Sequence, residues 1–180
     1  MAAGRHIENI EDLSYVLWEM GMFADREIID IFHELQITHV VWVPDSLTGT
    51  WERALDDAEG LSLIRVCREG EAWAIAAGLF VAGKRPLVIM QMTGFFESAD
   101  SMRNSLFDLQ LPLLAIVGGR NMLTETVDSA KTYAIPVVDA WGIEYAVVHS
   151  EEQKPELKRH LFHALQSGKP GLVVVAEAGG

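Results

Sequence analysis

Cysteine is almost absent from this chain of 180 residues: Cys67 is the single example. An internal disulfide is therefore excluded, and a lone thiol suits a reducing compartment. The sequence also lacks any apolar run near the roughly eighteen residues that a membrane span needs, and its N-terminus has no signal-peptide core. These absences predict a cytoplasmic protein without a membrane partner.

Positive charge is scarce as well. Fourteen Lys and Arg residues stand against twenty-six Asp and Glu residues, which gives a formal net charge of −12. Nucleic acids and anionic membrane surfaces both attract basic proteins, because phosphate groups need cationic partners. The charge balance therefore excludes nucleic acid and membrane surfaces as expected partners and indicates little more than good solubility.

Several common motifs are missing from the sequence. It contains no Gly-x-Gly-x-x-Gly, no phosphate-loop Gly-x-x-x-x-Gly-Lys-Ser/Thr and no Gly-x-Ser-x-Gly nucleophile elbow. Ordinary nucleotide sites and serine-hydrolase chemistry therefore have no support.

Short apolar runs alternate with segments of helical periodicity from residue 25 onward. The expected strands are 38–43, 61–67, 87–91, 112–117, 142–148 and 171–175. The expected helices are 25–35, about 99–109 and 155–165, with a loop and short helix at 122–131. Between the strand that ends at Gln91 and the helix at 99–109, Thr93-Gly94 is expected to break the chain's regular structure. This alternation, completed by a helix after Glu69, predicts one α/β domain: a doubly wound parallel sheet with helices on both faces.

The N-terminal residues form a separate part of the predicted organisation. Ile10, Leu13, Leu17 and Met20 repeat at helical spacing, so residues 1–21 are expected to be a helical extension and residues 22–180 the domain itself. The extension either packs on its own domain or contacts another subunit. Periodicity leaves both possibilities open.

One acidic residue stands where an expected strand gives way to a helix. At about 100° per residue, Glu69 falls inside the apolar stripe of the helix that it opens, whereas Glu71 falls well outside it. Ligands of open α/β sheets bind at this end of the strands, and a carboxylate there suits proton exchange. The structural alternative is an acid placed in the first helical turn, where the helix dipole favours it.

A second candidate stretch follows the first expected strand. Pro44, Asp45 and Ser46 combine turn-forming residues with side chains that cap helices. Asp45 and Ser46 either cap the next helix or face a ligand, and the sequence leaves both roles open.

These two stretches carry a resemblance to a known family. The chain reads Glu69-Gly-Glu-Ala, then Ala76-Ala77-Gly78, then Gly83-Lys84-Arg85-Pro86, then Met90-Gln91, with Val43-Pro44-Asp45-Ser46-Leu47 upstream. This pattern resembles the pyrimidine-binding (PYR) domain of thiamine diphosphate enzymes, over about residues 22 to 177. It is most similar to the branch of sulfopyruvate and phosphonopyruvate decarboxylases.

The resemblance implies a role for each candidate residue. Glu69 would be the catalytic acid, which hydrogen-bonds the pyrimidine N1′ of thiamine diphosphate and exchanges its proton. The cofactor-binding residues would be Pro44, Glu69, Gln91, Thr93 and Gly94. The substrate-binding residues would be Asp45, Ser46, Phe95 and Phe96.

The family holds the cofactor diphosphate and its Mg²⁺ with a Gly-Asp-Gly and a distant Asn, and this chain has no Gly-Asp-Gly. The resemblance therefore implies an alpha subunit of a hetero-oligomer, whose separate beta (PP-domain) subunit carries that motif and the magnesium ligands. The expected function is thiamine diphosphate-dependent decarboxylation of a 2-oxo acid. The alternatives are a carboligase subunit and a non-catalytic α/β binding module.

Two departures from the family bear on the substrate. Residues 92–97 read Met-Thr-Gly-Phe-Phe-Glu where the family has Asn-Ser-Gly-Leu-Gly-Asn, and residues 48–50 read Thr-Gly-Thr where a Lys is common. A sulfonate or phosphonate needs cationic or amide donors. Their loss, together with Phe95 and Phe96, favours a larger and more apolar 2-oxo acid than sulfopyruvate.

Overall fold

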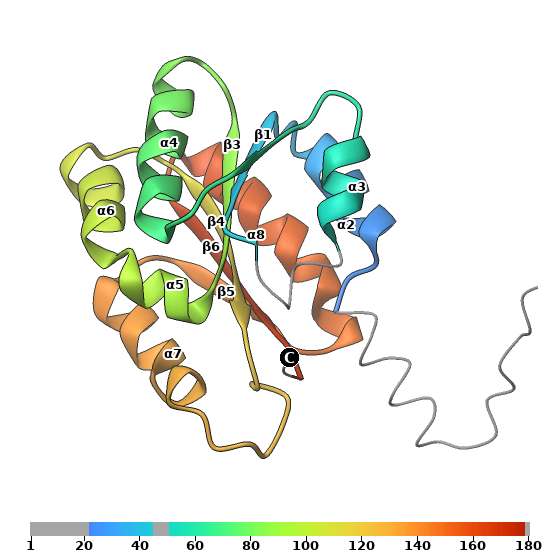
Figure 1. The fold of residues 1–180 in the computed structure, drawn as a ribbon, viewed down its shortest axis with the longest axis vertical. Helices are drawn as coiled ribbons and strands as arrows, with labels where there is room; N and C mark the ends of the chain where they lie inside the picture. Colours follow the sequence, from blue (N-terminus) through green and yellow to red (C-terminus); the bar gives the residue numbers. More distant parts are fainter. Residues whose placement is uncertain (1–21, 45–50, 179–180) are drawn as a thin grey trace, which may run out of the picture.

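The computed structural model describes residues 22–44 and 51–178 (Figure 1). The expected N-terminal extension, 1–21, and the candidates Asp45 and Ser46 lie outside the described residues. The strands are β1 His39–Trp42, β2 Ser62–Arg65, β3 Pro86–Gln91, β4 Leu114–Gly119, β5 Tyr145–Val148 and β6 Gly171–Ala176. The helices are α2 Asp25–Glu34, α3 Glu52–Asp57, α4 Glu69–Val81, α5 Met92–Glu97, α6 Ala99–Arg103, α7 Ser129–Trp141 and α8 Lys154–Ser167. A π-helical turn, η2 Asn104–Asp108, and a 3₁₀ turn, η3 Glu151–Gln153, complete the set.

The six strands form one sheet in the order β2-β1-β3-β4-β6-β5, and all neighbouring strands are parallel. The predicted doubly wound α/β fold is therefore confirmed. All carboxyl ends of the strands meet at one edge, the lower edge in Figure 1. Pairing of Gln91 with Gly118 brings the last residue of β3 level with the penultimate residue of β4 on this edge.

Helices cover both faces of the sheet (Figure 1). One core lies between the sheet and α2, α3 and α8, and includes Phe32, Leu55 and Leu161. The other lies under α4 to α7 and includes Trp73 and Phe95. Helix α3 leads from β1 to β2 on one face, and α4 leads from β2 past β1 to β3 on the other. The chain thus reverses direction between β1 and β3, and ligands of such folds bind in the crevice outside that point.

The central strands read as continuous apolar runs because both of their faces are covered. All six residues of β4 and all six of β6 are buried, as expected for a parallel sheet between two helical layers. Helix ends follow local chemistry: Asp128 caps α7 by accepting from Ala130 N at 2.8 Å, and Gly142 and Gly168 end α7 and α8 with φ of 63°. Left-handed backbone of this kind costs glycine little.

The expected break at Thr93-Gly94 is wrong, because the chain turns directly from β3 into helix α5 and Gly94 lies inside that helix. A glycine in a helix is unfavourable by propensity alone. Here it is tolerated because a neighbouring side chain occupies the space above it, as described below.

The stretch 122–131 holds turns rather than a short helix of its own, and the 13-residue helix α7 begins at Ser129. Periodicity missed most of this helix, in which Pro136 lies, a residue that normally breaks helical hydrogen bonding. The Asp128-Ser129-Ala130 sequence was the available signal, since Asp is a strong N-cap residue.

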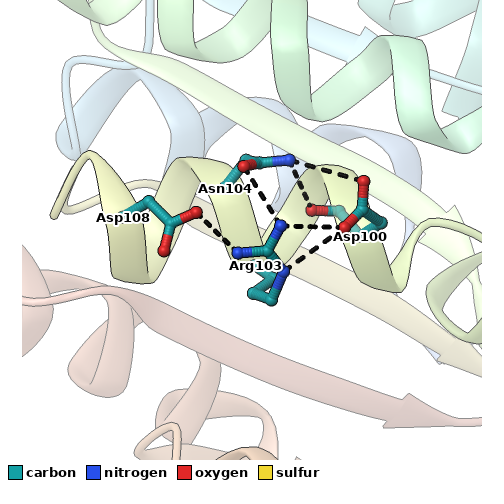
Figure 2. Close-up of polar contacts among 4 residues, drawn as sticks. All are labelled: Asp100, Arg103, Asn104 and Asp108. Carbon is teal, nitrogen blue, oxygen red and sulfur yellow. Dashed lines mark hydrogen bonds and ion pairs between the residues drawn. The ribbon is translucent and has the colours of Figure 1, made fainter.

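A salt-bridged cluster holds the π-helical turn η2 to the end of α6 (Figure 2). The Arg103 guanidinium contacts Asp100 at 2.9 Å and Asp108 at 2.6 Å, and Asn104 donates to the Asp100 carbonyl at 3.1 Å. These side chains are largely exposed, so each pair contributes little on its own. Together they tie the end of α6 to the first and last residues of the widened turn.

Candidate active site

Glu69 lies at the carboxyl edge of the sheet, as the first residue of α4 after β2 ends at Arg65. Its side chain is half-buried, while Glu71 is exposed. The next turn of the helix buries Ala72, Trp73, Ala76 and Ala77 against the sheet. The helical periodicity predicted this difference between the two acids, because only Glu69 shares the packed side of α4.

Gly94 of α5 lies directly beneath the Glu69 side chain. A β-carbon added to Gly94 would stand 2.3 Å from both Cγ and Oε1 of Glu69. No ordinary side chain could occupy position 94 unless Glu69 moved. The sequence placed these residues in one candidate site, and the structure brings them into contact.

The other candidate cofactor-binding residues lie at the same edge. Gln91 ends β3, and its Oε1 accepts a hydrogen bond of 2.9 Å from Thr93 Oγ1. Pro44 follows β1, the neighbouring strand, and is exposed. The structure therefore gathers Pro44, Glu69, Gln91, Thr93 and Gly94 around the reversal point between β1 and β3.

The two aromatic candidates differ in exposure. Phe95 is 0% exposed and belongs to the core under α4 to α7. Phe96 is half-buried and packs against that core. Phe95 therefore has no exposed surface to offer a substrate in this chain, and the aromatic role at this edge stays a proposal for Phe96.

An ion pair beside Glu69 was missed from the sequence. Arg68 Nη2 and Glu97 Oε1 are 2.5 Å apart, and 29 residues separate them in the chain. Arg68 immediately precedes Glu69, and Glu97 ends α5. The hydrogen bond from Arg68 holds the pKa of Glu97 below its usual range, with help from the Gly70 backbone N–H. No local pattern could pair two residues on separate helices.

A cavity of about 560 Å³ lies at the opposite edge of the sheet. Its lining includes Thr38, Pro86 and Leu114, which stand at or next to the starts of β1, β3 and β4. Arg85 also lines it, but this guanidinium donates to the Leu35 carbonyl at 2.7 Å at the end of α2. Arg85 thus satisfies a carbonyl at a helix C-terminus, as cations commonly do. Because the cavity lies at the opposite edge of the sheet, it is separate from the candidate site.

Residues 22–44 and 51–178 contain neither a metal-binding cluster nor a membrane-spanning helix. Within those ranges, no group of three or more His, Cys, Asp or Glu side chains is placed to hold a metal ion. No helix in the described part of the chain combines the length and apolarity needed to cross a membrane.

The carboxyl edge fits an aminopyrimidine-containing cofactor. It presents a carboxylate, an amide and a hydroxyl, from Glu69, Gln91 and Thr93, which can exchange hydrogen bonds with ring nitrogens and an amino group. The space that a β-carbon on Gly94 would fill is what lets Glu69 reach this position. The fold and this edge define a cofactor-binding α/β domain.

Comparison with known proteins identifies the family. Residues 22–152 match the thiamine pyrophosphate enzyme family at its N-terminal TPP-binding domain, and the chain belongs to this family. The resemblance to the sulfopyruvate decarboxylase branch is confirmed by two relatives. A sulfopyruvate decarboxylase from Methanosarcina acetivorans is 20% identical over 122 residues, covering 66% of this chain and 32% of the relative. A sulfopyruvate decarboxylase subunit alpha from Methanocaldococcus jannaschii is 26% identical over 106 residues, covering 59% of this chain and 63% of the relative.

The matched segments therefore span about a third of one relative and less than two thirds of the other.

Solved structures show the same fold. A benzoylformate decarboxylase from Polynucleobacter necessarius aligns with TM-score 0.71 at 19% identity, over 86% of this chain and 29% of that one. A thiamine diphosphate-dependent 4-hydroxybenzoylformate decarboxylase from Rhodococcus jostii aligns with TM-score 0.65, also at 19% identity, over 86% of this chain and 30% of that one. The chain is thus a thiamine diphosphate-binding domain related to decarboxylases.

Proposed function

We propose that this chain is the alpha, PYR-domain subunit of a two-chain 2-oxo acid decarboxylase that depends on thiamine diphosphate. The observation that carries the proposal is the contact between Glu69 and Gly94. A half-buried carboxylate is held at the ligand-binding edge of the sheet, over a position where only glycine leaves room for it.

In this proposal Glu69 is the acid that exchanges a proton with N1′ of the aminopyrimidine. Gln91 and Thr93 hydrogen-bond the same ring from the end of β3, and Pro44 borders it at the end of β1. When bound, the cofactor supplies the electron sink that decarboxylation of a 2-oxo acid requires. The work of this chain is to orient the pyrimidine, limit access of water to it, and hold or release the N1′ proton.

The proposal places the other half of the site on a separate beta subunit. That subunit would carry the Gly-Asp-Gly…Asn motif and the Mg²⁺ ligands, since the sequence of this chain has no Gly-Asp-Gly. The name of the M. jannaschii relative, a subunit alpha, supports such a division.

Cys67 is exposed, and a free surface thiol suits the reducing cytoplasm.

A carboligase subunit is the second candidate function. It would use the same Glu69 chemistry and differ only in whether a second carbonyl compound reaches the reacting carbon. The non-catalytic module is disfavoured by the Glu69–Gly94 contact. A helical glycine costs about 1 kcal/mol relative to alanine, and a chain without proton chemistry needs no such arrangement.

The experiment is reconstitution of the enzyme from two chains. The purified chain should show no tight binding of thiamine diphosphate with Mg²⁺ by calorimetry and should release no CO₂ from 2-oxo acids. Addition of a Gly-Asp-Gly chain encoded beside it should produce a hetero-oligomer in sedimentation, bind the cofactor and release CO₂. CO₂ is released by a decarboxylase and by a carboligase alike, so an added acceptor aldehyde that changes the second product from a free aldehyde to an acyloin would favour the carboligase.

Two outcomes contradict the proposal. Tight cofactor binding by the isolated chain would rule out a divided site. A mixture that assembles and binds thiamine diphosphate, yet turns over no 2-oxo acid with or without an acceptor, would favour the non-catalytic module.

A further inference from the structure

The Glu97 carboxylate contacts the residues on both sides of Glu69. It forms the 2.5 Å ion pair with Nη2 of Arg68, and the backbone N–H of Gly70 helps to hold the pKa of Glu97 below its usual range. A single carboxylate from α5 therefore pairs with the Arg68 side chain immediately before Glu69 and interacts with the Gly70 N–H immediately after it.

This contact supplies what the start of α4 lacks. The N-cap residue of α4 is Arg68, whose side chain makes no capping hydrogen bond. The first backbone N–H groups of a helix have no partners within the helix, and a carboxylate near them is favourable. Glu97 brings a carboxylate from another helix toward these N–H groups, so we expect the first turn of α4 to depend on α5.

Helix α5 also contacts the Glu69 side chain. Gly94, on the same short helix as Glu97, lies against Cγ and Oε1 of Glu69. On the α6 side, a β-carbon on Gly70 would stand 3.0 Å from Ser101 Oγ. The start of α4 is thus enclosed from two directions, by Gly94 and Glu97 of α5 and by Ser101 of α6.

We propose that Glu97 is a positioning residue, which acts through Arg68 and Gly70 to fix the direction in which Glu69 presents its carboxylate. The inference rests on the proposed function of Glu69 for its catalytic meaning. Glu97 itself exchanges no proton in this scheme. It restricts the start of α4 to one orientation, and misplacement of a catalytic group by about 1 Å can cost about a hundredfold in rate.

The charged groups around this contact agree with a positioning role. Arg68 faces Glu97, Glu71 and Glu69, and the hydrogen bond to Glu97 is the largest cause of its raised pKa. Glu71 is turned elsewhere, with its Oε2 accepting from the Cys67 backbone N–H at 3.2 Å. Glu97 is therefore the acid that engages Arg68 directly.

The test uses Glu97→Ala, Glu97→Gln and a matched control, Glu144→Ala. Glu144 accepts from Lys169 at 3.0 Å in an exposed ion pair at the opposite edge of the sheet, next to the starts of β5 and β6. Exchange of the Gly70 backbone proton is measured by NMR on the full chain, and kcat and KM are measured on the assembled enzyme.

Loss of one charge-assisted hydrogen bond should speed Gly70 exchange about tenfold in Glu97→Ala. The kcat should fall by about tenfold or more, with KM changed less than about twofold. Glu97→Gln keeps an acceptor oxygen and should lie between Glu97→Ala and the unmodified chain, while Glu144→Ala should resemble the latter.

Three results would overturn the inference. They are an unchanged Gly70 exchange rate in Glu97→Ala, faster exchange with an unchanged kcat, and an equal loss of kcat in Glu144→Ala. The first shows that the contact is absent, the second that Glu97 serves structure alone, and the third that any lost ion pair lowers activity.

The same assay separates this inference from the proposed function. If Glu69→Gln is inactive and Glu97→Ala fully active, the positioning role fails and the proposed function stands. If Glu69→Gln keeps its activity, the proposed function fails.

Discussion

The indole Nε1–H of Trp73 donates a hydrogen bond of 3.0 Å to Oγ of Ser98, and both side chains are buried. Trp73 lies on the packed side of α4, and Ser98 joins α5 to α6. This buried contact ties α5 to α4 from the core side, while the Arg68–Glu97 pair ties it from the exposed side. The two contacts together define the position of α5 beneath Glu69.

Ser98→Ala should therefore destabilise the protein. The substitution leaves the indole N–H of Trp73 buried without its acceptor, which costs about 1–3 kcal/mol of unfolding free energy. Urea unfolding measures the change. Ser167→Ala, at the exposed end of α8, is the control and should alter stability by no more than about 0.5 kcal/mol. Equal effects of the two substitutions would show that the buried contact contributes nothing.

Gly94→Ala should separate activity from stability. The added methyl group meets the flexible end of Glu69 rather than backbone, so Glu69 swings aside and the fold survives. Alanine also gains about 1 kcal/mol of helix propensity. The melting temperature should stay the same or rise, while kcat of the assembled enzyme falls by about a hundredfold.

Gly78→Ala is the matched control for that experiment. Position 78 is also a helical glycine, in α4, and nothing lies within 4 Å of a β-carbon placed there. Gly78→Ala should gain the same stability from helix propensity and keep full activity. If Gly94→Ala is fully active, Glu69 does not need its present position.

Glu69→Gln should nearly abolish turnover while leaving assembly and cofactor binding largely intact. The amide has almost the same shape and can still hydrogen-bond a pyrimidine nitrogen, but it cannot exchange a proton there. General acid–base groups contribute about 10²- to 10⁴-fold, so the loss should appear in kcat. Glu71→Gln is the control, because Glu71 is exposed and lies off the packed side of α4. Equal losses in the two variants, or unfolding of Glu69→Gln, would make Glu69 a structural acid.

Aromatic or long aliphatic 2-oxo acids should be preferred over sulfopyruvate, with kcat/KM at least about tenfold higher. A sulfonate needs strong donors, yet Arg68 at this edge is already paired with Glu97, and the half-buried Phe96 offers an apolar surface. Competition assays with phenylpyruvate and sulfopyruvate test this on the assembled enzyme. A kcat/KM for sulfopyruvate equal to or above that for phenylpyruvate would contradict the prediction.

Acid should remove the stabilising effect of Asp128. Its side chain is 8% exposed, and hydrogen bonds from Asn121 at 2.7 Å and from Ala130 N at 2.8 Å, with Arg120 nearby, hold its pKa below the ordinary 3.8. A carboxyl with a depressed folded-state pKa stabilises above its unfolded value, and this contribution is lost as pH falls through the folded value.

The measurement compares melting temperatures of the unmodified chain and Asp128→Ala across pH. The gap should be full at pH 7 and should shrink below about pH 3.8. A gap that stays constant down to pH 2 would show that Asp128 stabilises α7 without its charge.

Much of the fold was accessible from the sequence because its signals are local. Apolar runs bounded by Gly and Pro marked all six strands within a few residues of their ends, and the apolar repeat after Glu69 placed that acid on the packed side of α4. The side-chain periods of strands and helices depend on neighbours two to four residues apart. The alternation of these elements was enough to predict a parallel sheet with helices on both faces.

Tertiary structure alone decided how the site is built. The contact of Glu69 with Gly94 and the pairing of Arg68 with Glu97 join α4 to α5, helices that a whole strand separates in the chain. The same packing turned the expected break at Thr93-Gly94 into helix α5 and covered Phe95 completely. The sequence by itself determined that an acid opens α4 at the carboxyl edge. The surroundings of that acid were set by long-range packing, in which contacts between distant residues outweigh the weak local preference of glycine against helix.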